Sequence, residues 1–187
     1  MDEFKIRPYK EQDKPYLEEV CHKTATAKKY IRDKSLVCTL YLHYYLEHEP
    51  QNCFVAADED DRPIGYIVCA EDYGKYIDIF MEKYLPKVKK KDKMEALLKK
   101  LERRYLKKVC KNYPAHLHID ILPCGQNQGV GKKLMKALIS HLKSKDIGGI
   151  FLVVGSDNER AVRFYKKLGY ETHKSIFGKA YVMTMKL

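Results

Sequence analysis

The sequence predicts a single α/β domain that spans residues 1–187. Short apolar or alternating runs have the length of β-strands, and segments with apolar residues at helical spacing separate them. Over residues 115–143 an apolar strand, a glycine-containing turn and a helix follow one another. No internal repeat or flexible linker divides the chain, and its length suits one full hydrophobic core.

The first elements are read from polarity and capping residues. Residues 4–7 alternate in polarity and predict a strand. Asp13 is the expected N-cap of a helix over residues 13–28, and a second helix is expected over residues 34–49, before a proline. Residues 53–57 and 64–70 then predict two strands that an acidic turn joins as a hairpin.

Residues 73–113 interrupt this rhythm with apolar residues at helical spacing, so we expect a helical insertion between two strands. This segment holds 14 Lys and Arg against 5 Asp and Glu, whereas the whole chain has a net charge of +11. Nearly all the positive excess is therefore local. The remaining predicted elements are a strand at 115–122, a helix at 128–143, a strand at 150–154, a helix at 158–168 and strands at 170–176 and 180–185.

The composition is that of a globular protein, with 45% apolar and 33% charged residues. No stretch is long and apolar enough to span a membrane, and the N-terminus lacks the apolar core of a signal peptide. We therefore expect a cytoplasmic location and no membrane partner. The six cysteines include no C-x-x-C pair and no zinc-ligand spacing with histidine, so no metal site is expected.

The most informative stretch is residues 126–131, Gln-Asn-Gln-Gly-Val-Gly, between a strand and a helix. Glycine allows a close approach of the backbone to a ligand, and the free N–H groups of a helix start attract negative charge. Alone the pattern is weak, because a tight turn also selects glycine. It is not a P-loop, and it comes too late in the chain for a dinucleotide fold.

A second segment makes the first one specific. Residues 126–131 resemble the acetyl-CoA signature of the GNAT acetyltransferase superfamily, Arg/Gln-x-x-Gly-x-Gly/Ala. Residues 158–170 are similar to its segment Asn-x-x-Ala-x-x-Phe-Tyr-x-x-x-Gly-Phe/Tyr. The resemblance implies a single GNAT domain over 1–187. Its fold would be a mixed, mostly antiparallel sheet of about seven strands flanked by helices, with residues 73–113 inserted between strands 3 and 4.

The resemblance also implies acetyl-CoA as the cosubstrate. Backbone N–H groups from Gln126 to Lys132 would surround its pyrophosphate, and Lys132 would add positive charge. Asn127 stands where the family usually has glycine or a basic residue, but asparagine tolerates a left-handed backbone. The implied cosubstrate-binding residues are Ile121, Leu122, Gln126, Asn127, Gln128, Gly129, Val130, Gly131, Lys132, Asn158 and Tyr165.

Two of these residues have a second interpretation. Asn158 is also a natural helix cap, and Tyr165 is also a plausible core aromatic. The resemblance implies that Tyr165 protonates the departing CoA thiolate, a role that suits a phenol with a pKa near ~10. The end of the strand at Leu122 fits a splayed, bulged strand whose free backbone groups would bind the pantetheine amides.

The general base is expected on the strand before the glycine turn. Alternation places His116, His118 and Asp120 on one face of that strand. They either satisfy one another or supply the base, for which Asp120 and His118 are the candidates and Asp157 a third. Residues 115–123 also resemble a bacterial subgroup similar to the acetyltransferase-like domain that follows O-GlcNAcase catalytic domains, and this likeness favours Asp120.

The acceptor side is less defined. Tyr41 and Tyr45 share a helix face, which either packs in the core or forms the aromatic wall of an acceptor pocket. The expected function is an acetyl-CoA-dependent N-acetyltransferase that acts on a primary amine of a small molecule or protein by direct attack. The alternative is a non-catalytic acyl-CoA-binding module that docks a partner through the basic insertion. Nucleic acid is disfavoured, and a monomer and a homodimer both stay open.

Overall fold

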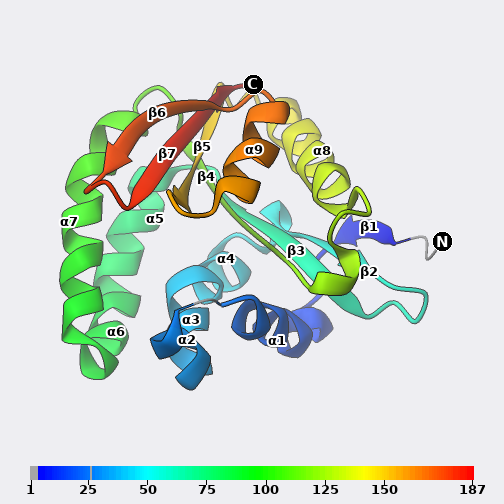
Figure 1. Ribbon diagram of the computed structural model, residues 1–187, viewed down its shortest axis with the longest axis horizontal. Coiled ribbons are helices and arrows are strands. Elements are labelled where there is room, and N and C mark those ends of the chain that lie inside the picture. Colours follow the sequence, from blue (N-terminus) through cyan, green and yellow to red (C-terminus); the bar gives the residue numbers. More distant parts are fainter. Residues whose placement is uncertain (1–3, 26) are drawn as a thin grey trace.

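The computed structural model describes residues 4–25 and 27–187, and within them the chain forms one seven-stranded sheet (Figure 1). The strand order is β1-β2-β3-β4-β5-β7-β6, and every neighbouring pair is antiparallel except β4 and β5. The predicted mixed, mostly antiparallel sheet is therefore confirmed. The strands are β1 (Lys5–Pro8), β2 (Phe54–Ala57), β3 (Pro63–Ala70), β4 (Ala115–Ile121), β5 (Gly149–Gly155), β6 (Glu171–Ile176) and β7 (Ala180–Lys186).

The first helices are shorter and more broken than the sequence predicts. The helix expected over 13–28 ends at Thr24, whose hydroxyl bonds the Val20 carbonyl, and the helix expected over 34–49 breaks at Leu42. The helices before the hairpin are η1 (Glu11–Asp13), α1 (Lys14–Thr24), α2 (Lys28–Arg32), α3 (Lys34–Tyr41), α4 (His43–His48) and η2 (Pro50–Asn52).

Asp13 occupies the predicted N-cap position of α1, but its side chain makes no capping hydrogen bond there. Its carboxylate instead accepts bonds of 2.7 and 2.9 Å from the Arg7 guanidinium and a 2.8 Å bond from the Lys10 N–H. Both side chains are buried, and a buried charge is stable only when it is paired. Asp13 therefore fastens β1 to the start of α1, a role that only the fold reveals.

The insertion between β3 and β4 is helical, as predicted. Its helices are α5 (Tyr73–Ile79), a π-helical stretch η3 (Phe80–Tyr84), α6 (Leu85–Lys91) and α7 (Lys93–Val109). The side chains of Asp72 and Asp92 accept hydrogen bonds from backbone N–H groups and so cap the starts of α5 and α7. Val88 and Leu106 are fully buried in the core that the insertion shares with α1, α3 and the sheet. The insertion is therefore part of the domain's packing.

Two further helices lie on the opposite face of the sheet. After η4 (Pro123–Gly125), α8 (Val130–Ser144) and α9 (Glu159–Lys167) pack over β3, β4 and β5 through a second apolar cluster. Figure 1 shows α1–α4 below the sheet, α5–α7 at the left and α8 and α9 above. Along the described ranges, no helix combines the length and the apolar character needed to cross a bilayer.

The two halves of the sheet separate at β4 and β5. These strands pair only at Ala115 with Ile150 and His116 with Phe151. Beyond His116 they diverge, so one edge of β4 keeps backbone groups that β5 does not bond. The expected splay is present, whereas the expected bulge is not: β4 pairs with β3 without a register shift from His116 to Ile121.

Candidate active site

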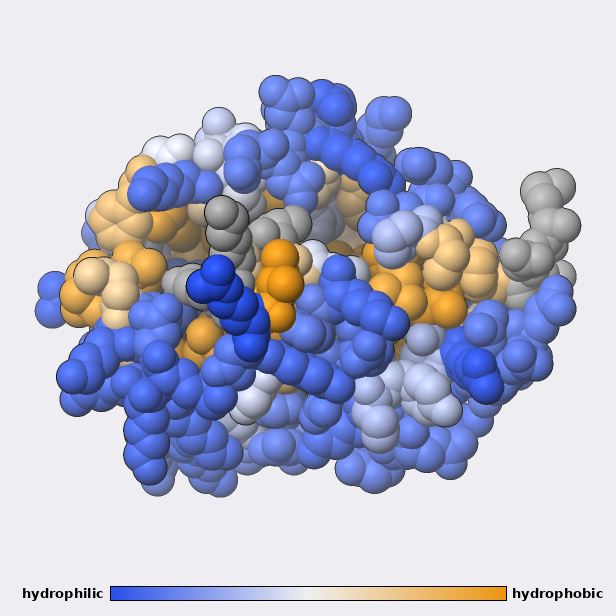
Figure 2. All heavy atoms as spheres, turned by 60° about the horizontal axis from the view of Figure 1, so that its bottom comes forward, coloured by the Kyte–Doolittle hydropathy of each residue, from blue (hydrophilic) through white to orange (hydrophobic). Residues whose placement is uncertain are grey.

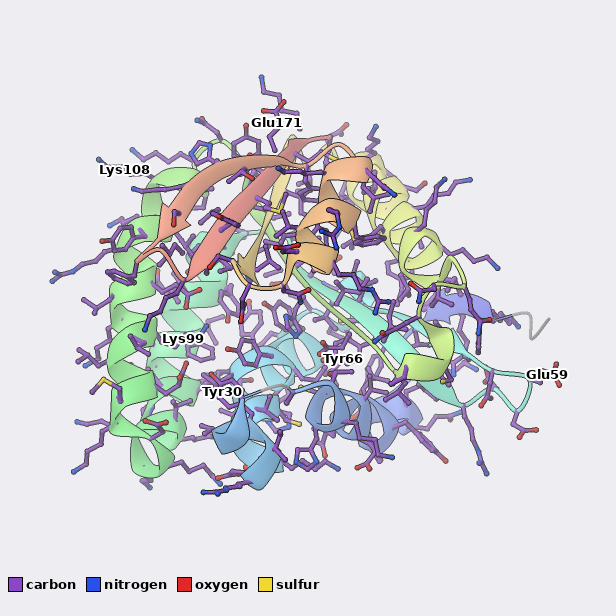
Figure 3. All side chains as sticks on the ribbon, in the orientation of Figure 1. Tyr30, Glu59, Tyr66, Lys99, Lys108 and Glu171 are labelled. Carbon is purple, nitrogen blue, oxygen red and sulfur yellow. The ribbon has the colours of Figure 1, made fainter. Side chains whose placement is uncertain are left out.

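The polar face of β4 opens into a cavity of about 450 Å³. His116, His118 and Asp120 all line it, as their alternation predicts. Helices α1 to α5 and α7, strand β5 and the β6–β7 turn supply the other walls. Figure 3 shows Lys99 reaching inward from α7, whereas Lys108 points away. We call this space the aromatic cavity after its tyrosines, which are Tyr30, Tyr41, Tyr45, Tyr73 and Tyr76.

A second cavity of about 750 Å³ lies between the end of β4, the glycine turn and α9. We call it the turn groove. Thr24 and Asp120 line both cavities. Asp120 therefore stands where the turn groove meets the aromatic cavity. The other lining residues of the turn groove are Ile119, Ile121, Gly125, Gln126, Asn127, Gly129, Gly131, Lys132, Asn158, Arg160, Ala161, Arg163, Phe164, Tyr165, Lys167 and Leu168.

Asp120 is held by two hydrogen-bond donors. The Tyr66 hydroxyl donates to its Oδ2 at 2.5 Å, and the His118 Nε2 lies 3.0 Å from the same oxygen. Burial alone would raise the pKa of Asp120, but the charge and hydrogen bonds of its neighbours outweigh it and lower that pKa. Asp120 is therefore ionised at neutral pH and acts as a hydrogen-bond acceptor.

His118 is oriented from two sides. Its ring stacks on Tyr41 with centroids 5.0 Å apart and planes 20° apart, and its Nε2 faces the ionised Asp120. A carboxylate acceptor favours the tautomer that carries the proton on Nε2, which leaves a lone pair on Nδ1. A histidine fixed in this way can take a proton from a group in the aromatic cavity.

His116 has a different environment from His118. Its Nδ1 lies 2.9 Å from the Tyr45 hydroxyl, and four aromatic rings surround it. Burial, followed by the charges of Lys99 and His118, lowers the pKa of His116 to about 3. His116 therefore stays neutral at every working pH and has a structural role on the polar face of β4.

Tyr165 is buried on α9 and lines the turn groove. Burial, and then the charge of Asp120, raise the pKa of its phenol. The hydroxyl therefore stays protonated at working pH, as a proton donor must. Phe164 lines the groove as well, and its ring packs where a side chain on Gly131 would stand.

The glycine turn has the left-handed backbone that its sequence anticipates. Asn127 has a φ of 62° and Gly129 a φ of 75°. The first intrahelical bond of α8 joins the Lys133 N–H to the Gly129 carbonyl at 3.0 Å. The N–H groups before Lys133 therefore have no partner inside the helix and form an anion site at its start.

Arg160 is a groove residue that the sequence reasoning missed. Its guanidinium donates to the side-chain oxygens of Gln126 at 2.9 Å and Asn127 at 3.1 Å. The Gln126 amide in turn donates to the Ile121 carbonyl at 2.8 Å. Arg160 therefore ties α9 to the glycine turn. Its position inside the 158–170 segment was the available signal.

The expected cosubstrate residues divide into two groups. Ile121, Gln126, Asn127, Gly129, Gly131, Lys132, Asn158 and Tyr165 line the turn groove. Leu122, Gln128 and Val130 do not: the Leu122 N–H bonds the Ile64 carbonyl, the Gln128 side chain bonds the Cys124 carbonyl, and Val130 is buried in the core. Asn158 both caps α9 through the Ala161 N–H and lines the groove, so its two interpretations are compatible.

Three other expectations concern residues near the site. Asp157 lines neither cavity, which leaves Asp120 and His118 as the candidates for the base. Tyr41 and Tyr45 both face the aromatic cavity, and Tyr45 is packed in the core at the same time. Among residues 4–25 and 27–187, no cluster of potential ligands could hold a metal ion.

Comparison with known proteins adds a family and several relatives. The model of the Acetyltransferase (GNAT) family matches residues 16–170. N-alpha-acetyltransferase 30 of Schizosaccharomyces pombe (strain 972 / ATCC 24843) is 26% identical over 173 residues, which cover 92% of this chain and 87% of that protein. Protein O-GlcNAcase of Rattus norvegicus is 25% identical over 182 residues, and the match covers 89% of this chain but only 20% of that longer protein.

Solved structures agree with these matches. The crystal structure of SsHAT is 26% identical, has a TM-score of 0.86 and covers 98% of both chains. The structure of the PaiA N-acetyltransferase from Thermoplasma acidophilum in complex with coenzyme A has a TM-score of 0.65 at 18% identity, with 99% of both chains covered. The similarity to the PaiA structure shows a shared fold.

Proposed function

We propose, on the premise that this chain belongs to the GNAT acetyltransferase family, that it transfers an acetyl group from acetyl-CoA to a primary amine. The family resemblance read from residues 126–131 and 158–170 is confirmed by the family match, and the O-GlcNAcase match supports the expected subgroup. The carrying observation is the position of Asp120, where the turn groove meets the aromatic cavity. The turn groove suits an anionic donor, and the aromatic cavity suits an amine.

The turn groove has the chemistry of a CoA site. The α8 start offers backbone N–H groups, and four basic side chains, Lys132, Arg160, Arg163 and Lys167, line the same groove. The diverging edge of β4 leaves backbone groups for the pantetheine amides. The PaiA structure, whose fold this chain shares, was determined with coenzyme A, and this supports acetyl-CoA as the cosubstrate here.

The proposed reaction is a direct transfer. His118, oriented by Asp120, takes a proton from the acceptor ammonium so that the amine nitrogen can attack the thioester carbonyl. The new carbon–nitrogen bond forms, the carbon–sulfur bond breaks as the carbonyl re-forms, and Tyr165 gives its proton to the departing thiolate. The amide nitrogen then loses its remaining extra proton to solvent, and solvent returns a proton to the Tyr165 phenolate. Backbone N–H groups polarise the carbonyl, and the two cavities bring amine and thioester together at Asp120.

The acid role of Tyr165 is tested by its replacement with phenylalanine. CoA-thiol release against a panel of primary amines should show kcat of Tyr165→Phe lowered by about 10²-fold. The calorimetric Kd for acetyl-CoA should stay within about twofold, because the ring remains. Tyr170→Phe is the matched control: this hydroxyl is buried and bonds nothing in the described part of the chain, so its loss should leave kcat unchanged.

The donor site is tested at the glycine turn. Gly131→Glu adds a charged side chain against Phe164, whose ring lies 3.1 Å from the position that a Cβ would take there, and should abolish acetyl-CoA binding in calorimetry. Gly148→Glu is the control, because Gly148 is exposed and a Cβ added there would meet no atom within 4 Å. Unchanged affinity of Gly131→Glu would remove the cosubstrate assignment. Tight acetyl-CoA binding without thiol release for any amine would instead favour the non-catalytic CoA-binding module.

A further inference from the structure

Helix α7 carries an exposed apolar strip beside the mouth of the aromatic cavity. Met94 is 63% exposed, Leu97 49% and Leu98 41%, and Phe177 of the β6–β7 turn is 53% exposed. Tyr105 joins them, because its ring lies 5.0 Å from that of Phe177. We define the apolar strip as Met94, Leu97, Leu98, Tyr105 and Phe177. Figure 2 shows apolar atoms gathered at the left end of the molecule, where α6 and α7 lie.

The strip is part of the entrance to the site. Leu98 and Phe177 also line the aromatic cavity, so whatever covers the strip lies against the mouth. Residues three or four apart share a helix face, and Met94, Leu97 and Leu98 have this spacing. Exposed aliphatic side chains gathered in one patch mark an interaction surface more often than scattered ones do.

A basic ridge borders the strip along α7. Lys100, Arg104 and Lys108 are exposed and four residues apart, and each lies three residues after an apolar or aromatic residue, Leu97, Leu101 or Tyr105. We define these three as the basic ridge. In the ranges that the structure describes, none of them has an ion pair, in contrast to Lys91 with Asp33 and Arg103 with Asp78.

The opposite side of the strip is acidic. Glu95 and Glu102 line the aromatic cavity from α7, and Asp120 lies deeper within it. Lys99 is paired with Glu102 at 2.8 Å. The cavity lining therefore holds three carboxylates against two lysines, Lys99 and Lys179. The basic ridge and the carboxylates of the cavity lining therefore lie on opposite sides of the strip.

We propose that the apolar strip and the basic ridge dock an acidic peptide segment of a protein acceptor, whose primary amine enters the aromatic cavity. This inference rests on the proposed acetyl transfer and names the class of acceptor. The ammonium would meet the carboxylates and tyrosines of the cavity, apolar residues after it would cover the strip, and Asp or Glu would face the ridge. From Met94 to Tyr105 the helix rises about 17 Å, the length of roughly five extended residues.

Other occupants fit this charge pattern less well. A second copy in a two-fold dimer with antiparallel α7 helices would place ridge against ridge, with like charges facing each other. A nucleic acid would be drawn to the ridge, but it would leave aliphatic strip residues without stacking partners. An anionic bilayer would be drawn to the ridge and repelled by the acidic mouth.

The experiment uses two twelve-residue peptides with one free N-terminal amine and no lysine. One carries Leu, Met, Asp and Glu after the amine, and the other has arginine in place of every acidic residue. The small amine 2-phenylethylamine is the third acceptor. Thiol release gives kcat/KM for each, and anisotropy of a C-terminally labelled peptide gives binding that does not depend on turnover.

We expect the acidic peptide to exceed the arginine peptide by more than tenfold in kcat/KM and in affinity, with the advantage falling as salt rises. Lys100→Glu/Arg104→Glu/Lys108→Glu should remove or reverse this preference and leave 2-phenylethylamine turnover and acetyl-CoA affinity unchanged. Met94→Gln/Leu97→Gln should weaken peptide binding in the same way. The control variant Lys136→Glu/Lys143→Glu/Lys186→Glu makes an equal charge change on α8 and β7. It should change neither the preference for the acidic peptide nor the affinity for it.

The outcomes separate the two proposals. Turnover of 2-phenylethylamine with no preference between the peptides overturns the docking surface and leaves acetyl transfer standing. Ridge-dependent peptide binding without turnover of any amine supports the docking surface and overturns acetyl transfer. Three other results, each without a preference between the peptides, overturn the acidic-peptide assignment. They are ridge-dependent binding to phosphatidylserine vesicles, a shift of single-stranded RNA, and a dimer in light scattering that Leu97→Asp dissociates.

Discussion

Asp120 shows how one residue gains its role from neighbours distant in sequence. Its partner Tyr66 lies on β3, fully buried and directly opposite in the strand pairing. The alternation of β4 predicts that His118 and Asp120 share a face, because side-chain direction in a strand is a local property. Nothing in the sequence identifies Tyr66, because its contact with Asp120 depends on the register between two strands separated by the insertion.

Removal of the Tyr66 hydroxyl should weaken the ionised form of Asp120. The hydrogen bond from Tyr66 helps to lower the pKa of Asp120, so in Tyr66→Phe that pKa rises and the acid limb of the kcat/KM–pH profile moves to higher pH. At pH 7 Asp120 stays ionised in both proteins, so we expect little change in kcat/KM there and a loss of activity that is confined to the acid limb.

The matched control for Tyr66→Phe is Tyr44→Phe, which removes another buried phenol that donates to a carboxylate, Glu49 at 2.9 Å, away from the site. It should lower stability and leave the pH profile in place. A Tyr66→Phe enzyme with an unmoved acid limb would show that Asp120 ionisation does not control the reaction.

At the scale of elements, the strands and the helices of the C-terminal half follow the sequence closely. Strong apolar alternation and the glycine turn determine them locally. The N-terminal helices do not, because the break at Leu42 and the end of α1 at Thr24 have no proline or glycine to announce them. Arg160 was missed for a related reason: its partners, Gln126 and Asn127, belong to another element.

The insertion should unfold together with the rest of the domain. Leu106 is 1% exposed in the shared core, so Leu106→Ala should lower the free energy of unfolding by about 2–5 kcal/mol. Leu97→Ala, at a position 49% exposed on the same helix, should change it by less than about 0.5 kcal/mol. Urea unfolding followed by circular dichroism measures both. Two separate transitions in the wild-type protein would mean that α5–α7 are an independent unit.

For the whole molecule, the partly buried His116 links stability to pH. Its pKa in the folded state is about 3, below the ordinary 6.5, so the unfolded chain binds the extra proton between these values. Stability is therefore full above pH 6.5 and declines as pH falls toward 3, with a slope of at most about 1.4 kcal/mol per unit from this group.

His116→Phe should flatten that part of the stability–pH curve. It should also cost about 1–3 kcal/mol at pH 7, because the Tyr45 hydroxyl loses its partner. Chemical denaturation at a series of pH values from 7 to 4 tests both statements. His173→Phe, at an exposed histidine of β6, serves as the comparison, and an equally steep decline in His116→Phe would place the acid sensitivity elsewhere.

The sequence by itself determined the half of the site that we propose for the donor. A strand, the turn at 126–131 and a helix form an anion site through local backbone geometry, and the segment at 158–170 follows at a fixed spacing, so short-range order suffices. The tertiary structure alone decided the half that we propose for the acceptor. The aromatic cavity joins residues from α1 to the β6–β7 turn, and the network around Asp120 needs two strands in register. Contacts between such distant segments are fixed by packing, which no local pattern encodes.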